Sequence, residues 1–472
     1  MAALAASVAV AVLILAVASC FWPGIPMFDT IEQYRQVLGG PVDDWHPPLM
    51  VRLWQLLHRF GSGTAPIFAL QVALYAFGFA LLVATLVRIG RWRAGLAVTV
   101  LALSPLLLGW EMVVLKDLQM LSALLAAVGL VAWFRLTGQP VPLLAAVAAA
   151  ILILYATLIR ANGVFVTAPL SVLVVRPRGG LLVNGGMIAL GAVAILAPTP
   201  IINHHLLHSE PSTIAKAEPV FDLAAIAVRT PRSAPSVFTR AERVQIISRH
   251  CVKPYFWDPL GDPSACGRVT ERLRDQPAKL LYLKLARAII RYPGAYALHR
   301  LAHWNSTERW LVPPQLPDGG PPDDAEDNDL GLAASTSDFV GTWQDWAADE
   351  MGTPLGWPIV WTALAFILLP LAWYRRNEAE GSLAFALLAS AIALEASFLV
   401  ISIASDLRYH LWPMTASALA LILLSDRIRL KAWEWIAASA ALAAVVGGGV
   451  AARNLFPQAP DSYDAMIAAP TD

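Results

Sequence analysis

Long apolar runs separated by short charged connectors dominate this sequence and restrict what it can fold into. A membrane-spanning helix needs about 20 predominantly apolar residues, and runs near that length recur along most of the chain. Only 14% of the 472 residues are charged, whereas soluble domains carry roughly 25%. The sequence therefore predicts an all-α polytopic membrane protein with about eleven transmembrane helices. The expected spans are 4–22, 65–87, 94–110, 118–134, 141–158, 164–175, 183–202, 356–374, 383–404, 411–425 and 433–451.

The connectors between these spans differ in charge between the two sides of the membrane. Arg and Lys gather in the short connectors 88–93, 135–140, 176–182, 374–382 and 426–432. Cytoplasmic loops carry an excess of these cations, so we expect the N-terminus inside and the C-terminus outside. The net charge is zero, which gives no sign of a nucleic-acid partner, and the partner common to all spans is the lipid bilayer.

The spans form two groups with a long polar segment between them. We expect an N-terminal transmembrane module at 1–202, whose first outer loop, 23–64, would be catalytic. An α-rich extracytoplasmic domain at 203–354 would follow, then a C-terminal transmembrane module at 355–452 and an outer tail at 453–472.

Two of the three cysteines, Cys251 and Cys266, lie in the polar segment. They can form a disulfide if this segment faces an oxidising compartment, and two free thiols are the alternative. The expected outer position favours the disulfide.

The first outer loop contains acidic and polar side chains directly after an apolar span. Asp29, Glu32 and Gln33 have the spacing i, i+3 and i+4 and would share one face of a helix. Asp29 could act as a general base, with its neighbours orienting it. A helix-capping or solvated acid is the alternative. His46 precedes two prolines that fix the backbone, and it could bind phosphate, ligate a metal or cap the turn.

Three cations lie at separate turns on the same expected face of the membrane: Lys116, Arg160 and Arg408. Together they could hold a phosphate, which Arg binds through two parallel hydrogen bonds and Lys as a point charge. Contact with phospholipid headgroups, or pairing with Asp117 and Asp406, is the alternative. Charged groups at membrane depth usually face a cavity or a partner, and these turns all offer charges to the same outer face.

These motifs resemble the GT-C superfamily of membrane glycosyltransferases, in particular bacterial relatives of protein O-mannosyltransferases and of the lipid A aminoarabinose transferase. The resemblance rests on Asp29 with Glu32-Gln33-Tyr34, on Trp45-His46-Pro47-Pro48-Leu49, on Lys116-Asp117, on Leu158-Ile159-Arg160-Ala161-Asn162-Gly163 and on Asp406-Leu407-Arg408-Tyr409. It covers most of the first seven spans and the turn at 405–410, and it is poor in 203–354.

The resemblance implies an inverting transfer of a sugar from a polyprenyl-phosphate donor to an acceptor hydroxyl, on the outer face of the bacterial cytoplasmic membrane. Asp29 would be the catalytic base, and Lys116, Arg160 and Arg408 would bind the donor phosphate. The supporting or substrate-binding residues would be Glu32, Gln33, Tyr34, His46, Asp117, Asn162, Asp406 and Tyr409. The acceptor would be a glycan, a lipid or a protein.

One departure from the family's pattern concerns metals. Related families often have paired acids in the second outer loop, whereas this chain has Lys116-Asp117. We therefore assign no cofactor and no metal ligand from the sequence. This departure also argues against a requirement for a divalent metal.

Two other functions fit a polytopic protein with buried charges. One is a transporter or flippase for a lipid or small solute, although transport sites usually lie near the middle of the membrane. The other is a non-catalytic factor in envelope-glycan assembly that uses 203–354 for docking. Nucleotide-binding and hydrolase motifs that would indicate other chemistry are missing from the sequence.

Overall fold

The computed structural model describes residues 1–175, 178–230, 237–317, 319–428, 431–460 and 462–468. Within these ranges the chain is helical, and its only strand-like pairings are two isolated bridges. This confirms the predicted all-α class. Some positions of the expected connectors, of the 203–354 domain and of the tail lie outside the described residues, namely 176–177, 231–236, 318, 429–430, 461 and 469–472.

The chain divides into two compact units, each of which combines distant segments. The first unit comprises Met1–Glu210, Gly320–Glu395 and Arg408–Ala443, and the second comprises Pro211–Gly319, Ala396–Leu407 and Ala444–Asp472. The expected 203–354 segment is therefore shared, because 320–354 packs within the first unit. The functional boundaries drawn from the sequence stay predictions.

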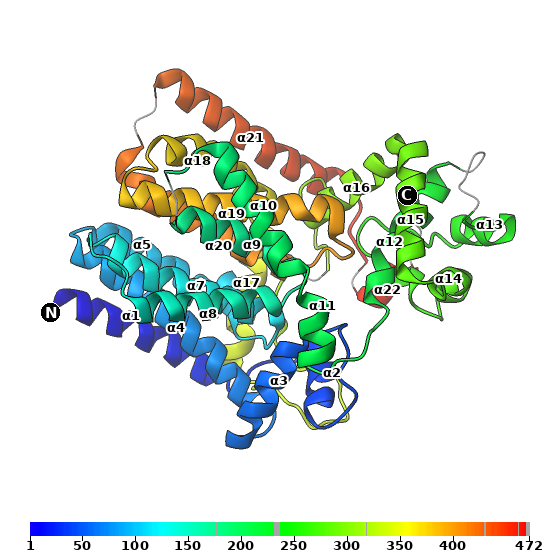
Figure 1. Cartoon of the computed structure of the whole chain (residues 1–472), viewed down its shortest axis with the longest axis horizontal. Coiled ribbons are helices and arrows are strands. Elements are labelled where there is room, and N and C mark those ends of the chain that lie inside the picture. Colours follow the sequence, from blue (N-terminus) through cyan, green and yellow to red (C-terminus); the bar gives the residue numbers. More distant parts are fainter. Residues whose placement is uncertain (176–177, 231–236, 318, 429–430, 461, 469–472) are drawn as a thin grey trace. The chain divides into compact units, whose positions relative to one another are not determined.

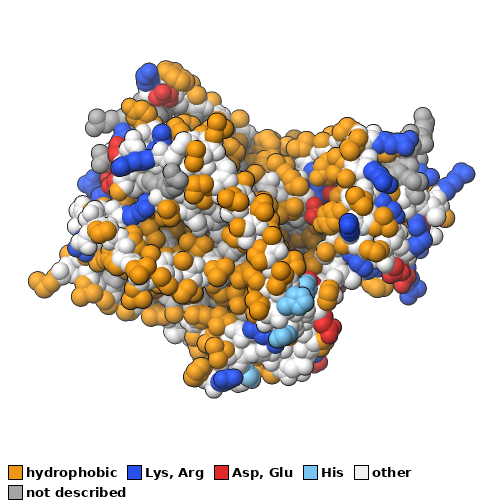
Figure 2. All heavy atoms as spheres, viewed as in Figure 1, with side chains coloured by type: hydrophobic (Ala, Val, Ile, Leu, Met, Phe, Trp, Pro, Cys, Tyr) orange, Lys and Arg blue, Asp and Glu red, His pale blue; other side chains and the backbone are white. Residues whose placement is uncertain are grey.

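The first unit is built mainly from long apolar helices, several of which lie side by side (Figure 1). The helices that begin in it are α1 (Ala2–Cys20), α4 (Ala65–Arg88), α5 (Trp92–Ala102), α6 (Pro105–Glu111), α7 (Lys116–Arg135), α8 (Leu143–Leu158), α9 (Gly163–Val175), α10 (Leu181–Leu196), α11 (Thr199–Ile201), α18 (Pro358–Tyr374), α19 (Ala379–Ile401), α20 (Leu411–Leu424) and α21 (Ala432–Leu455). Figure 2 shows hydrophobic side chains over most of the visible surface along α1.

Among the described residues, 7 helices are long and apolar enough to cross a membrane, or 8 if the bent pair α5 and α6 is one span. Three further apolar helices, α8, α9 and α18, are shorter. These helices lie where the sequence predicts spans, and the chain is a multi-pass membrane protein. The total of eleven spans and their orientation stay predictions.

The centre of the first unit is the close contact between α4 and α7. A Cβ atom added to Gly78 would lie 2.5 Å from the backbone carbon of Leu125, and one added to Gly129 would lie 2.6 Å from the Gly78 carbonyl oxygen. Any side chain at either position would push the helices apart. In a membrane, such close backbone approach is a main source of attraction between helices.

A buried chain of hydrogen bonds fixes the register of α4, α7 and α8. Gln119 on α7 donates through Nε2 to the Gln71 Oε1 of α4 at 3.1 Å. Its own Oε1 accepts from the Tyr155 hydroxyl of α8 at 3.0 Å. Because the membrane interior offers no water to satisfy these groups, they must pair with one another, and sliding one helix would leave them unpaired.

Several shorter helices connect the long ones. They are α2 (Phe28–Val37), α3 (Pro48–Leu57), η1 (His58–Phe60), η2 (Ile202–Leu206), α17 (Asp338–Gly352), η4 (Pro354–Gly356), η5 (Leu407–His410) and η6 (Ser425–Arg427). The helix α17 packs on α6, where Gln344 donates through Nε2 to the Gly109 carbonyl at 3.2 Å.

The second unit consists of shorter amphipathic helices. They are α12 (Ile214–Arg229), α13 (Arg240–Ser248), η3 (Asp258–Leu260), α14 (Gly267–Arg274), α15 (Ala278–Arg291), α16 (Pro293–Thr307) and α22 (Tyr463–Ala468). Buried charges pair inside it: Arg300 donates to the Asp222 carboxylate at 2.7 Å and lies 3.3 Å from Glu218. Cys251 and Cys266 form a disulfide, with their Cα atoms 5.9 Å apart.

We predict that this disulfide stabilises the second unit. It closes a loop with a sequence separation of 15, and a loop of that length contributes about 3 kcal/mol. Replacing both Cys251 and Cys266 with Ala should therefore lower the thermal unfolding midpoint and increase proteolysis of this unit. The control is Cys20→Ala, because Cys20 is free and exposed. Equal stability of the double variant and the control would contradict the prediction.

Candidate active site

The loop that carries Asp29 is held against the turn before α7 by backbone hydrogen bonds. Ile25 donates to the Met112 carbonyl at 3.0 Å, and Val114 donates to the Ile25 carbonyl at 3.0 Å. The Thr30 hydroxyl donates to the Val114 carbonyl. Gly24, at φ +95°, allows this approach because a Cβ there would lie 2.7 Å from the Phe68 ring. These contacts bring the first turn of α2 to the first turn of α7.

The turn itself is supported from inside the bundle. Gln71 on α4 donates through Nε2 to the Glu111 carbonyl at 2.7 Å and to the Val113 carbonyl at 2.9 Å. The Ser122 hydroxyl donates to the buried Glu111 carboxyl at 2.6 Å. The end of α6 and the start of α7 are thereby fixed, which fixes the position of Lys116.

Asp29 lies between two of the three predicted cations. Its Oδ2 atom is 2.7 Å from Lys116 Nζ and 3.4 Å from Arg408 Nη2. Lys116 Nζ also lies 3.4 Å from His46 Nδ1. The side chains of Asp29 and Lys116 keep 17% and 18% of their surface exposed, so a substrate group can reach them.

Asp117 has the complementary position and is almost fully buried, with 1% of its side chain exposed. Its Oδ1 atom pairs with Arg160, and its Oδ2 atom lies 3.6 Å from Arg408 Nε. Arg408 therefore joins the two carboxylates. As a residue in the first turn of α7, Asp117 is also stabilised by the positive end of the helix dipole.

Arg160 is held in a fixed orientation after the end of α8. Its Nε donates to the Asn162 side-chain oxygen at 2.7 Å, and its guanidinium carbon lies 4.1 Å from the centre of the Tyr409 ring. Arg408 lies 5.6 Å from the same ring. Tyr409 thus contributes a cation–π contact to both arginines.

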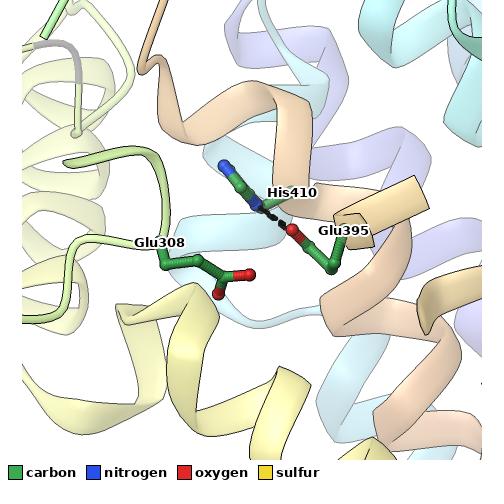
Figure 3. Close-up of side chains that lie close together, drawn as sticks. All are labelled: Glu308, Glu395 and His410. Carbon is green, nitrogen blue, oxygen red and sulfur yellow. Dashed lines mark hydrogen bonds and ion pairs between the residues drawn. The ribbon is translucent and has the colours of Figure 1, made fainter. Parts of the chain in front are cut away.

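The short η5 turn that carries Arg408 and Tyr409 is fixed by a buried pair. His410 Nδ1 lies 2.9 and 2.8 Å from the two carboxylate oxygens of Glu395 on α19. Figure 3 shows the imidazole pointing at this carboxylate; Glu308, which is also drawn, belongs to the second unit. Because Glu395 is 3% exposed and His410 is fully buried, the pair constrains the backbone next to Arg408.

The electrostatics of the cluster hold Asp29 ionised at neutral pH. Burial alone would raise the pKa of Asp29, but Lys116, Arg408 and His46 together lower it well below its usual value. Burial, Lys116 and Arg408 lower the pKa of His46 to about 4, so its imidazole is neutral at pH 7. Three cations face two carboxylates, which leaves one positive charge in excess.

Eight of the predicted site residues therefore meet in the first unit, namely Asp29, His46, Lys116, Asp117, Arg160, Asn162, Arg408 and Tyr409. Their catalytic and binding roles stay predictions.

The other predicted residues have different surroundings. Glu32 lies 3.6 Å from Arg35 on the same helix, and the Tyr34 hydroxyl accepts from the Gly63 amide at 2.8 Å. Gln33 is buried, and its Nε2 has no hydrogen-bond partner among the described residues. Asp406 belongs to the second unit.

Sequence reasoning missed the residues that support the cluster from within the membrane region: Gln71, Glu111, Glu395 and His410. A signal was present, because each is a polar residue inside or next to an apolar run, where an ionisable or amide side chain is costly unless it is paired. The sequence could have identified them as candidates, but not their partners.

The fold and the cluster define a multi-pass helical membrane protein with a charged site at the ends of its helices. No protein-family model matches this sequence, and a search of curated proteins finds no significant match.

Among solved structures, the chain is similar to the archaeal oligosaccharyltransferase AglB from Archaeoglobus fulgidus, in complex with an inhibitory peptide and a dolichol-phosphate. The identity is 13% and the TM-score 0.37, over 99% of this chain and 56% of that one. The chain thus spans about half the length of that protein. At a TM-score below 0.5, the likeness assigns no substrate and no residue role here.

The buried neutral state of His46 leads to a prediction about pH. Between pH 6.5 and 4 the unfolded chain binds a proton at this imidazole and the folded chain does not, so stability falls as the pH drops. From pH 7 to pH 5 the loss from this group is about 2 kcal/mol. His46→Gln should remove this part of the pH dependence of the thermal unfolding midpoint. His205→Gln, at an exposed imidazole, should keep it, and a wild-type pH dependence in His46→Gln would refute the assignment.

Proposed function

We propose that this chain is an inverting glycosyltransferase, which moves a sugar from a polyprenyl-phosphate donor to an acceptor hydroxyl at the outer face of the cytoplasmic membrane. The observation that carries the proposal is the meeting of Asp29 with Lys116 and Arg408, each from a different part of the chain. A carboxylate beside cations in excess suits a reaction that takes up a proton and releases a phosphate.

The phosphate would bind to Lys116, Arg160 and Arg408. Arg160 and Arg408 already use part of their donor groups on Asp117, and a guanidinium has five N–H donors in total. The remaining excess positive charge attracts the anionic donor. It is also positioned to stabilise the negative charge that develops on the leaving phosphate, which is usually the largest contribution to catalysis.

The chemical step would be a single displacement. The acceptor oxygen attacks the anomeric carbon while the bond from that carbon to the phosphate oxygen breaks. The electron pair of this bond goes to the lipid phosphate, and the hydroxyl proton goes to the Asp29 carboxylate. Configuration at the anomeric carbon inverts, and the products are the glycosylated acceptor and the polyprenyl phosphate.

Donor binding would also tune Asp29 as a base. With Lys116 and Arg408 beside it and no phosphate to share them, the Asp29 carboxylate has a low pKa and holds protons weakly. A phosphate that shares these two cations would weaken their pull and raise the pKa of Asp29 toward the range of a useful base. The base would thus become effective once the donor is bound.

The charge pairing also bears on cofactors. Both oxygens of Asp117 face arginines, so charge neutralisation on the donor side is available from the chain's own guanidinium groups. We therefore propose that transfer does not require a divalent metal.

Two features support an outer-face site. The disulfide in the second unit requires an oxidising compartment, and the basic connectors lie at the opposite helix ends from Lys116 and Arg160. The position of the charges also favours an enzyme over a transporter, because Lys116 and Asp117 begin α7 and Arg160 follows the end of α8. Transport sites usually lie near the middle of the membrane.

Asp29→Asn is the central test. We expect it to reduce the release of polyprenyl phosphate from a panel of polyprenyl-phosphate sugars by about 10²–10⁴-fold, the usual contribution of a general base. The matched control is Glu32→Gln, which makes the same neutralisation one turn later at a carboxylate that pairs with Arg35. If both variants release the lipid at the wild-type rate, Asp29 is not the base. If the folded wild type releases none from any donor, transport or assembly becomes the better proposal.

Arg160→Lys tests the phosphate site while keeping the charge. Lysine cannot form the planar contact with Tyr409 together with the bonds to Asn162 and Asp117. We expect about a 10- to 100-fold lower rate of lipid release, in line with the loss of one oriented charge-assisted contact. Arg52→Lys on α3, where the guanidinium binds the Leu207 carbonyl, is the control. Comparable losses in the two variants would point to a general effect on folding.

A further inference from the structure

A second polar site lies at the far end of α7 from Lys116. A cavity of about 630 Å³ is lined there by Arg135, the last residue of α7, by Val175 at the end of α9, by Arg178, and by Arg376, Asn377 and Glu378 between α18 and α19. The helix α7 has 20 residues, and at 1.5 Å per residue it is about 30 Å long. That length equals the hydrocarbon thickness of a bilayer, so the cavity lies at the opposite membrane surface from Asp29.

The lining of the cavity is positively charged. Arg135, Arg178 and Arg376 come from three different segments, whereas Glu378 is the only acid among the described residues of the lining. The Glu378 carboxylate is already engaged by Arg375, at 3.0 and 3.3 Å. The Glu378 carboxylate therefore does not neutralise the three arginines that line the cavity, and the cavity keeps an excess of positive charge.

Arg376 is oriented before any ligand binds. Its Nη1 donates to the Trp373 carbonyl at 2.8 Å, and its guanidinium carbon lies 3.8 Å from the centre of the Trp373 ring. Its Nε is buried and has no hydrogen-bond partner within the described part of the chain. A buried donor without a partner is costly, and an anion in the cavity would satisfy it.

The two connectors that form the cavity are joined to each other. Arg178 donates through Nη2 to the Asn377 carbonyl at 3.3 Å. Cations that only determine membrane orientation need no such arrangement, because the positive-inside rule counts charges in loops without regard to their geometry. Here three cations surround one volume, which indicates a binding site for an anion.

We propose that this cavity binds the phosphate of an anionic membrane phospholipid, with phosphatidylglycerol as the representative headgroup. Basic pockets between helices at the cytoplasmic surface are suited to such headgroups. The lining also contains Val175 and Ala379, and an apolar wall favours a lipid over a free phosphate ion. The proposal does not depend on the glycosyltransferase function, since none of these residues belongs to the Asp29 cluster.

The test uses the full-length protein in nanodiscs, with binding followed by native mass spectrometry. The probes are phosphatidylglycerol in a phosphatidylcholine background, phosphatidylcholine alone, and inorganic phosphate with phosphatidylcholine. We expect phosphatidylglycerol to be retained by the wild type and its affinity to fall at least tenfold in Arg135→Gln/Arg376→Gln. Retention of inorganic phosphate but not of phosphatidylglycerol would overturn the lipid assignment.

Two further variants separate a site from a general charge effect. Arg93→Gln removes an exposed arginine from another basic connector, where it lies over Trp92, and should retain the lipid as the wild type does. Glu378→Gln removes the acid of the lining and should increase the affinity. An equal loss of lipid affinity in Arg93→Gln and in the double variant would overturn the proposal, and so would weaker lipid binding in Glu378→Gln. The higher affinity that we expect for Glu378→Gln cannot result from misfolding.

Discussion

The first unit depends on the need to pair every charge that the chain places near the membrane interior. Lys116, Asp117 and Arg408 lie at the ends of apolar helices, where water is scarce and an unpaired charge is costly. Each is paired with a charge from another segment. Because these pairs form only when α2, α7, the turn after α8 and the η5 turn meet, they draw the ends of the helices together. The same pairs leave one cation in excess, and this excess is the basis of the anion binding that we propose for the cluster.

Neutral and acidic groups inside the bundle support these charges. Gln71 fixes the turn before α7, and Glu395 fixes the turn that carries Arg408 through His410. Gly78 and Gly129 allow α4 and α7 to approach closely enough for this network to form. The positions of the charged side chains in the cluster therefore depend on contacts made deep in the helices, and a loop alone would not hold them.

The helix α7 connects the two anion sites proposed for this chain. Lys116 at its first residue belongs to the cluster around Asp29, and Arg135 at its last residue lines the opposite cavity. The negative end of the helix dipole lies at the C-terminus of α7 and disfavours an anion there. An anionic lipid at this end would therefore depend on the positive charges of Arg135, Arg178 and Arg376.

The sequence by itself determined the helical class, the positions of the apolar helices and the residue types of the site. Apolar runs of membrane length and charges at their ends are local properties, so Asp29, Lys116, Arg160 and Arg408 could be selected without a structure. Asp29 and Glu32 share one helical face, and Glu32 pairs locally with Arg35 on the same helix, whereas only a tertiary contact brings Asp29 to Lys116. The sequence also grouped 320–354 with the polar segment 203–354, and only the structure shows that α17 within it packs on α6 through the Gln344 bond to Gly109. Which distant charges meet, and which polar groups hold them, was decided by the packing of the helices, because pairing depends on distances in space that the order of residues does not contain.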